Sequence, residues 1–241
     1  AAILDQWQCW QQELSQMDCV RVDRCYRQDN DPVVKCQLHV FGDASENAFG
    51  VVAYLRLERE DGTGCCSFVM SKARVAPIKQ LSIPRLELQA AVMAVRVADA
   101  IKAEHDMTIH ETVFWTDSST VLQWINSESR RYNTFVANRI SEIQDSSEMT
   151  QWRHVPGALN PADICSRGCH VADLAPDGVW IQGPAFLRSP PADWPAAPAR
   201  LTARTGEEQT AEMRATVCAT INPEPTRSAA DPGRRGPEPS Q

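Results

Sequence analysis

Residues 37–73, QLHVFGDASENAFGVVAYLRLEREDGTGCCSFVMSKA, predict three consecutive β-strands. Apolar and β-branched residues dominate the runs 37–43, 48–58 and 65–73. The last two runs are separated by EDGTG (60–64), a turn of the Asp-Gly kind that joins two strands into a hairpin. This stretch therefore predicts the antiparallel part of a sheet.

Downstream of these strands, helical and strand patterns alternate. A long helix is predicted over 84–105, with Pro84 in its first turn, and a strand over 111–117 follows it. The remaining predicted elements are a helix at 118–126, a helix at about 133–147, a strand at 150–155 and a helical turn between 160 and 168. Strands joined through helices lie parallel, so we expect an α/β fold in which a five-stranded mixed sheet is flanked by helices.

Composition divides the chain into four predicted parts. Residues 1–33 form an amphipathic helix and a linker, 34–170 form the globular domain, and 171–195 form an extension that packs on the domain or leaves it. Residues 196–241 are rich in Pro and Arg, contain no aromatic residue and are expected to be disordered. The first helix presents two Trp on one face, and we expect it to pack on the next domain or on a neighbouring protein.

Composition also excludes several classes of protein. No run approaches the ~20 apolar residues of a membrane helix, and no secretory signal is evident, so we expect an intracellular protein that does not bind membranes. Because residue 1 is Ala, the sequence is expected to be a piece of a longer chain. The net charge of −7 argues against a protein that coats nucleic acid electrostatically. The nine cysteines include no C-x-x-C pair, which argues against a standard zinc site.

Four acidic residues stand at the ends of predicted elements. Asp43 ends the first strand and Asp117 ends the fourth, while Glu87 lies early in the long helix and Asp163 in the last helical turn. If the first and fourth strands are neighbours, these carboxylates converge at the carboxyl edge of the sheet. Carboxylates that converge repel one another unless cations neutralise them, and oxygen ligands favour Mg²⁺ or Mn²⁺. The pattern thus predicts a metal-dependent hydrolytic site.

Each of these residues also has a purely structural explanation. Asp117 precedes SST and could cap a helix, and Glu87 could simply favour the helix dipole. Asp43 could belong to a turn, and Asp163 could be a solvated helix residue. These explanations suffice for each residue singly, but they account poorly for all four in this order.

Four motifs resemble those of type 1 ribonuclease H, in the version found in BEL/Pao-type retrotransposon polyproteins. They are FGDAS (41–45), PRLELQAAV (84–92), WTDSSTVLQWI (115–125) and HVPGALNPAD (154–163). The resemblance covers about 34–170, and 1–33 is similar to the segment that links the polymerase to ribonuclease H. It implies a ribonuclease H-like fold and hydrolysis of the RNA strand of RNA–DNA hybrids.

The resemblance also implies cofactors, partners and residue roles. Two Mg²⁺ ions, for which Mn²⁺ can substitute, would bind Asp43, Glu87, Asp117 and Asp163. His154 would assist proton transfer or product release from a mobile loop, and Ser45, Arg85, Ser118 and Asn160 would contact the hybrid. The implied partners are an RNA–DNA hybrid and a reverse transcriptase domain, in a cytoplasmic replication particle or in the nucleus.

Two departures from the family leave other functions open. The interval from Asn160 to Asp163 is one residue shorter than in most cellular members, and 126–150 contains no basic insertion. One alternative is a catalytically silent or co-opted module, derived from a retroelement, that binds hybrids or other partners. Another is a nuclease of the same fold that acts on DNA. Contacts to the 2′-hydroxyl of the substrate would distinguish an enzyme that cuts RNA from one that cuts DNA.

Overall fold

The computed structural model describes residues 2–27, 31–196 and 212–213. Its centre is one five-stranded sheet with the order β3-β2-β1-β4-β5. The strands are β1 (Lys35–Ala44), β2 (Ala48–Glu58), β3 (Gly64–Val75), β4 (Glu111–Thr116) and β5 (Trp152–His154). β2 is antiparallel to both β1 and β3, whereas β4 is parallel to both β1 and β5. The predicted mixed sheet is therefore confirmed, and the first and fourth strands are neighbours, which is the condition under which Asp43 and Asp117 converge.

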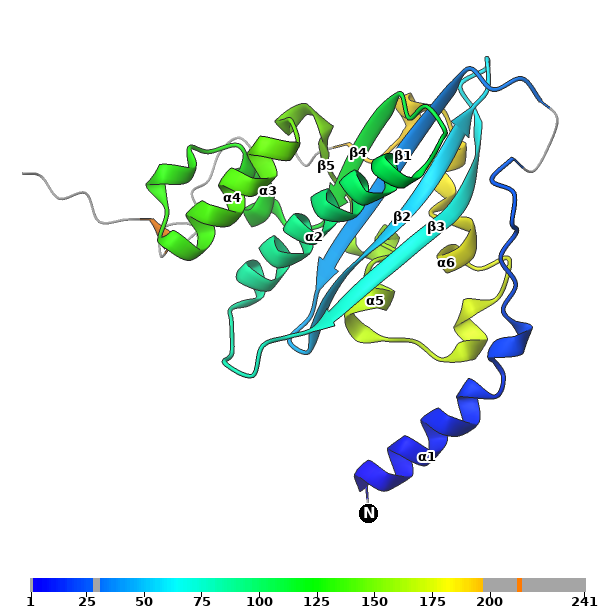
Figure 1. The fold of residues 1–241 in the computed structure, drawn as a ribbon, viewed down its shortest axis with the longest axis horizontal. Helices are drawn as coiled ribbons and strands as arrows, with labels where there is room; N and C mark the ends of the chain where they lie inside the picture. The colour runs from blue at the N-terminus through cyan, green and yellow to red at the C-terminus, as the bar shows by residue number, and fades with distance from the viewer. Residues whose placement is uncertain (1, 28–30, 197–211, 214–241) are drawn as a thin grey trace, which may run out of the picture.

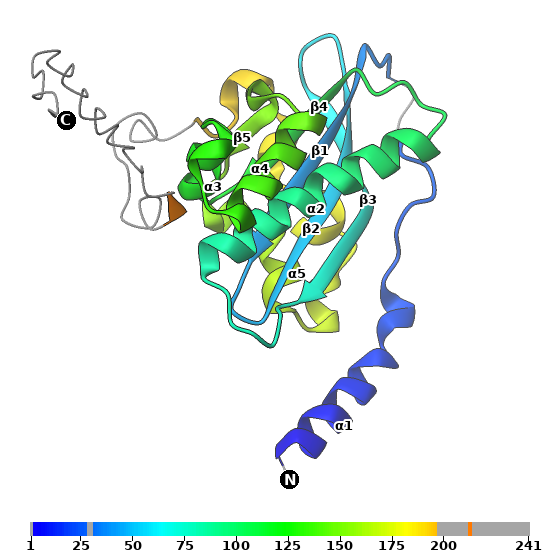
Figure 2. The same ribbon diagram turned by 60° about the vertical axis from the view of Figure 1, so that its left-hand side comes forward.

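Helices cover both faces of this sheet (Figures 1 and 2). One face carries α2 (Ile83–Glu104), α3 (Ser119–Ile125) and α4 (Thr134–Ser146), and the other carries α5 (Asp163–Arg167) and α6 (Val179–Gln182). The short 3₁₀ turns are η1 (Met17–Cys19), η2 (Ser129–Arg131), η3 (Met149–Gln151), η4 (Gly157–Leu159), η5 (Val171–Leu174), η6 (Ala185–Arg188) and η7 (Pro191–Asp193). Within the described ranges, no helix is both long and apolar enough to cross a membrane.

The long helix α2 packs closely on β1 and β2 because its inner surface is made of small residues. Ala91, Ala94 and Ala98 are at most 3% exposed. A Cβ at Gly42 of β1 would lie 3.5 Å from the backbone of Ala90, so the helix and the strand approach to ordinary contact distance. Short side chains on both partners thus hold α2 close to the strand that leads to Asp43.

The opposite face is covered by the segment that follows α5. Leu187 and Trp194 are buried beside Phe41 and Trp115. Arg56 of β2 is fully buried, and its guanidinium donates to the backbone oxygens of Leu187 and Gly62 at 2.6 Å each, to Ser189 at 3.2 Å and to the Gln37 side chain at 2.6 Å. Buried donors are costly unless they are satisfied, so Arg56 binds residues 187–189 firmly to the sheet.

The N-terminal helix α1 (Ala2–Leu14) lies apart from the sheet (Figure 1). Trp7 and Trp10 are 52% and 50% exposed, so the expected packing of this helix on the next domain is wrong. Its link to the rest is an exposed contact of 2.8 Å between Glu13 Oε1 and His170 Nδ1. Packing of its apolar face on a neighbouring protein stays a prediction, because no partner chain tests it.

The predicted disorder of 196–241 falls almost wholly outside the described residues. From this part of the chain, the structure describes residue 196 and the pair Glu212 and Met213. The pair contacts the domain: Asn133 N donates to Glu212 O at 2.8 Å, and Tyr132 forms a β-bridge with Met213. The proposed limits of the four parts stay a prediction.

Candidate active site

The parallel pairing of β1 with β4 places two aspartates side by side. Gly42 lies opposite Thr116 in the register, and the next residue on each strand is Asp43 or Asp117. Asp43 is 5% exposed, and Asp117 is half-buried. Both residues therefore lie at the carboxyl ends of neighbouring parallel strands, where sites form in open α/β sheets.

Asp43 is a strongly perturbed acid. Burial raises its pKa to about 6, the Ser166 hydroxyl opposes this shift, and the charges of Asp117 and Asp163 add to it. The Ser166 hydroxyl donates a short hydrogen bond to Asp43 Oδ2 from α5. The charges of both other aspartates thus act on Asp43, so the three carboxylates share one electrostatic environment.

Asp117 is covered by the loop that follows β5. Burial raises its pKa, and the charge of Asp163 does so too, while Arg167 and the Asn160 side chain lower it. A Cβ at Gly157 would come within 3.1 Å of Asp117 Oδ2, so the loop runs close to the carboxylate. Asp117 Oδ1 is buried without a hydrogen-bond partner among the described residues. This oxygen thus carries an unused capacity to accept a hydrogen bond or to bind a cation.

Glu87 is linked to Asp117 through the intervening serine. The Ser118 hydroxyl donates to Glu87 Oε2 at 2.6 Å and accepts from Val121 N at 3.2 Å. Ser118 is therefore the N-cap of α3 and at the same time holds the Glu87 carboxylate beside the end of β4.

Asp163 is more accessible than the buried Asp43. It begins α5, its side chain is 48% exposed, and its Oδ1 lies 2.5 Å from Arg167 Nε, one turn later. The charges of Asp43 and Asp117 also raise the pKa of Arg167, after the larger effects of Asp163. Arg167 is thus the cation that the aspartates share in this structure.

His154 occupies a strand end. It is the last residue of β5 and lies opposite Thr116, so its expected position in a mobile loop is wrong. Its Nε2 lies 3.2 Å from the backbone oxygen of Asp117, and that oxygen can only accept, so Nε2 donates. Burial lowers the His154 pKa, against the effect of this hydrogen bond. His154 lies beside Asp117, and its catalytic role stays a prediction.

The other predicted hybrid contacts already have intramolecular partners. Ser45 Oγ donates to the backbone oxygen of Ser166 at 2.6 Å, and the Arg85 guanidinium pairs with both Glu212 oxygens at 2.6 and 3.0 Å. Asn160 is 5% exposed, and its amide donates to Gly42 O at 3.1 Å. Asn160 thus fixes the loop before Asp163 against β1. Contacts of these residues and of Ser118 with a hybrid stay predictions.

A divalent cation fits the donor chemistry, although the ligands are not gathered around one point. Within 2–27, 31–196 and 212–213, no three His, Cys, Asp or Glu side chains are close enough together to hold a metal ion. The buried oxygen of Asp117 and the raised pKa of Asp43 nevertheless indicate carboxylates whose negative charge Arg167 compensates only in part. Carboxylate oxygens are the ligands that Mg²⁺ prefers, so these residues suit a hard cation.

Sequence reasoning missed two residues that contact the acids, Ser166 and Arg167, and one that pairs with Arg85, Glu212. Ser166 follows Asp163 by three residues and Arg167 follows it by four, which are the spacings of neighbours on a helix. The Asp163–Arg167 pair was therefore detectable, whereas nothing local linked Ser166 to Asp43. Nothing in the sequence indicated a role for Glu212, because its hydrogen bond with Arg85 joins residues 127 positions apart.

The first part of the chain matches a known protein family. Residues 1–118 match the family model of the Pao retrotransposon-like RNaseH-like domain. This range contains Asp43, Glu87 and Asp117, and it ends before His154 and Asp163. No curated protein sequence matches the chain.

Solved structures similar to this chain include several RNase H1 enzymes. RNase H1 from Halobacterium salinarum NRC-1 shares 18% identity, with coverage of 54% of this chain and 93% of that chain, at a TM-score of 0.34. The RNase H domain of rv2228c from Mycobacterium tuberculosis shares 16% identity, with coverage of 56% of this chain and 91% of that chain, at a TM-score of 0.37. LC11-RNase H1 in complex with an RNA/DNA hybrid shares 14% identity, with coverage of 58% of this chain and 100% of that chain, at a TM-score of 0.39. Over residues 1–118, just under half of its length, the chain is therefore similar to the Pao retrotransposon-like RNaseH-like domains.

Proposed function

We propose that this protein is a ribonuclease H, a Mg²⁺-dependent endonuclease that hydrolyses the RNA strand of RNA–DNA hybrids during retrotransposon reverse transcription. One observation carries the proposal: Asp43 is buried at the end of β1, and its pKa is raised to about 6 by burial and by the charges of Asp117 and Asp163. Such a cluster costs folding energy and is typical of a site that binds cations.

Asp43, Glu87, Asp117 and Asp163 would hold the two metal ions. When bound, a pair of divalent ions supplies an activated water and stabilises the leaving oxygen of a phosphodiester. The chain itself supplies the negative charge and the alignment. Ser166 orients Asp43, and Ser118 orients Glu87 at 2.6 Å. Asn160 and Gly157 hold the neighbouring loop against Gly42 and Asp117.

His154 would act on protons beside Asp117. Its Nε2 donates to the Asp117 backbone oxygen, which leaves Nδ1 to accept a proton. Because burial lowers its pKa, neutral imidazole is favoured near pH 7. We assign His154 to proton transfer or product release on this basis.

The proposed partners are an RNA–DNA hybrid and the reverse transcriptase domain of the same polyprotein. The family is retrotransposon-like, and the exposed apolar face of α1, with Trp7 and Trp10, suits a partner domain. We propose an intracellular site of action, in a cytoplasmic replication particle or in the nucleus.

A silent or co-opted hybrid-binding module is the second candidate. The carboxylates are not gathered at ligand distance within the described part of the chain, and Arg85 is paired with Glu212. These two features would suit a module that has lost cleavage. The presence of all four acids favours the enzyme instead.

The test is cleavage of a labelled RNA–DNA hybrid by the full chain in Mg²⁺, Mn²⁺ or EDTA, beside Asp117→Asn. Asp106→Asn, on an exposed loop, is the matched control. We expect metal-dependent cutting of the RNA strand that Asp117→Asn abolishes and Asp106→Asn retains. Hybrid binding without cutting would favour the silent module, and equal cutting of duplex DNA would favour a DNA nuclease.

A further inference from the structure

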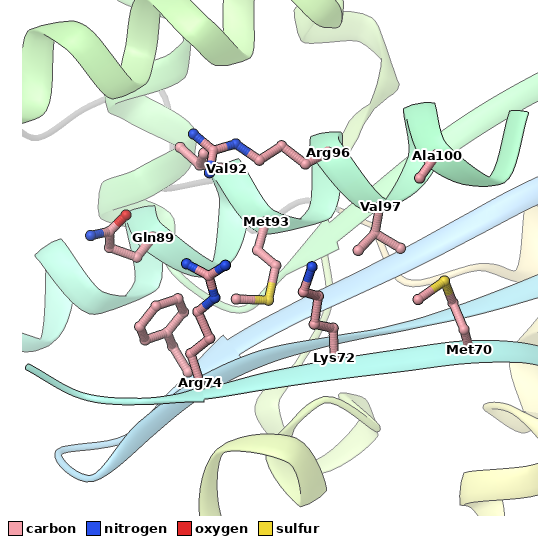
Figure 3. A pocket seen from close by; sticks show the side chains of 10 residues that line it. Met70, Lys72, Arg74, Gln89, Val92, Met93, Arg96, Val97 and Ala100 are labelled. Carbon is pink, nitrogen blue, oxygen red and sulfur yellow. The ribbon is translucent and has the colours of Figure 1, made fainter. Parts of the chain in front are cut away.

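A small cavity opens at the edge of the sheet, between β3 and α2 (Figure 3). Its volume is about 150 Å³. Lys72 and Arg74 extend from β3 toward α2, and Gln89 lies on the helix near the Arg74 guanidinium (Figure 3). The chemistry of the cavity is therefore decided by two cationic side chains and one amide.

The two cations are not neutralised within the protein. Lys72 and Arg74 are exposed, and neither forms an ion pair with any residue in the described part of the chain. The third cation of the cavity, Arg96, is paired with both Glu142 oxygens at 2.5 and 3.0 Å. In a protein with a net charge of −7, two adjacent uncompensated cations form a local site for an anion.

The walls of the cavity do not oppose this attraction. Phe49, Met93 and Val97 line it between the charged groups, and none of the described lining residues is acidic. An anion in this cavity therefore meets no opposing carboxylate among the described lining residues. The volume of about 150 Å³ is below the ~300–1,000 Å³ that is usual for whole small-molecule ligands. The cavity therefore suits a single anionic group.

The cavity lies at the same end of the sheet as the acids. Ala73 is opposite Gly50, and Gly50 is opposite Asp43, so Lys72 and Arg74 flank the level of Asp43 two strands away. Successive residues of a strand point to opposite faces, so Lys72 and Arg74 point to the α2 face, whereas Asp43 points to the face of α5, where it contacts Ser166. A bound polymer that contacts both places would therefore pass around the end of the sheet.

We propose that Lys72, Arg74 and Gln89 bind one phosphodiester group of the hybrid, outside the cutting site. This inference rests on the proposed ribonuclease H function and adds a second contact to it. The Arg74 guanidinium offers paired donors to phosphate oxygens, and the Lys72 ammonium adds a point charge. The contact anchors the backbone without reading its sequence.

Hybrid affinity as a function of salt tests this proposal. The full chain, Lys72→Gln/Arg74→Gln and the control Arg24→Gln/Lys102→Gln are compared in EDTA between about 50 and 200 mM salt. Arg24 and Lys102 are exposed cations outside this cavity. We expect the first variant to bind about ten-fold more weakly and to reduce the slope of log affinity against log salt by about one, because one phosphate contact is lost. The control keeps the wild-type slope.

Cleavage in Mg²⁺ separates this proposal from the proposed function. Loss of the anchor should raise KM and leave kcat unchanged, because the cavity residues do not touch the reacting phosphate. An unchanged slope in the Lys72/Arg74 variant overturns the anchor, while continued RNA cleavage leaves the ribonuclease H function standing. A wild-type protein that neither binds nor cuts the hybrid overturns both. Arg74→Lys, which keeps the charge, should retain the wild-type slope.

Discussion

Replacing Asp43 with Asn should stabilise the protein when metal ions are removed. The pKa of Asp43 is raised from 3.8 to about 6, first by burial. The folded protein therefore holds the proton more tightly than the unfolded chain, and its stability falls as the pH rises from about 4 through about 6. A shift of about two units corresponds to about 3 kcal/mol of penalty above that range.

The Asn side chain removes this charge and keeps the shape. Its oxygen still accepts the hydrogen bond from Ser166, and its amide can donate to a neighbouring carboxylate. In EDTA at pH 7.5, we expect the free energy of unfolding of Asp43→Asn to exceed that of the wild type by about 1–3 kcal/mol. The difference should shrink as the pH falls through 4 and vanish below about pH 3, where Asp43 is protonated in both the folded and the unfolded state.

Urea unfolding across this pH range, with and without Mg²⁺, measures these differences. A metal that binds only the folded state stabilises it by mass action, so Mg²⁺ should raise the stability of the wild type and leave Asp43→Asn nearly unchanged. The exposed Asp106→Asn is again the control. A variant less stable than the wild type at pH 7.5 in EDTA, or a difference independent of pH, would refute the reasoning.

Three other changes test separate contacts. Arg56→Ala leaves buried acceptors without their guanidinium, so urea unfolding should show a loss of about 3–5 kcal/mol; a loss below 1 kcal/mol would contradict this. Ser166→Ala removes the hydrogen bond that lowers the Asp43 pKa, so the acid limb of the pH–rate profile should move to higher pH. An acid limb that stays at the same pH would argue against Asp43 as the titrating group. Glu212→Gln should release Arg85 at a cost of about 1 kcal/mol or less, and should tighten hybrid binding in a fluorescence titration; unchanged affinity would mean that Arg85 does not contact the hybrid.

Local patterns predicted most of the fold because the elements are set by short-range signals. The run 48–58 coincides with β2, and the helix predicted over 84–105 is observed as α2, Ile83–Glu104. Apolar periodicity and the Asp-Gly turn act within a few residues of each other. The mixed character of the sheet followed from the antiparallel hairpin and the crossovers, whereas the strand order comes from the structure.

The sequence by itself determined that four acids stand at element ends, because the type and end of each element depend on neighbouring residues. Only the tertiary structure decided what surrounds them. Ser166 reaches Asp43 across 123 positions, and Asn160 reaches Gly42 across 118. The tertiary structure also decided that α1 is exposed, because no surface of the described domain covers Trp7 and Trp10. Contacts between distant segments depend on how whole elements pack, and no local pattern encodes them.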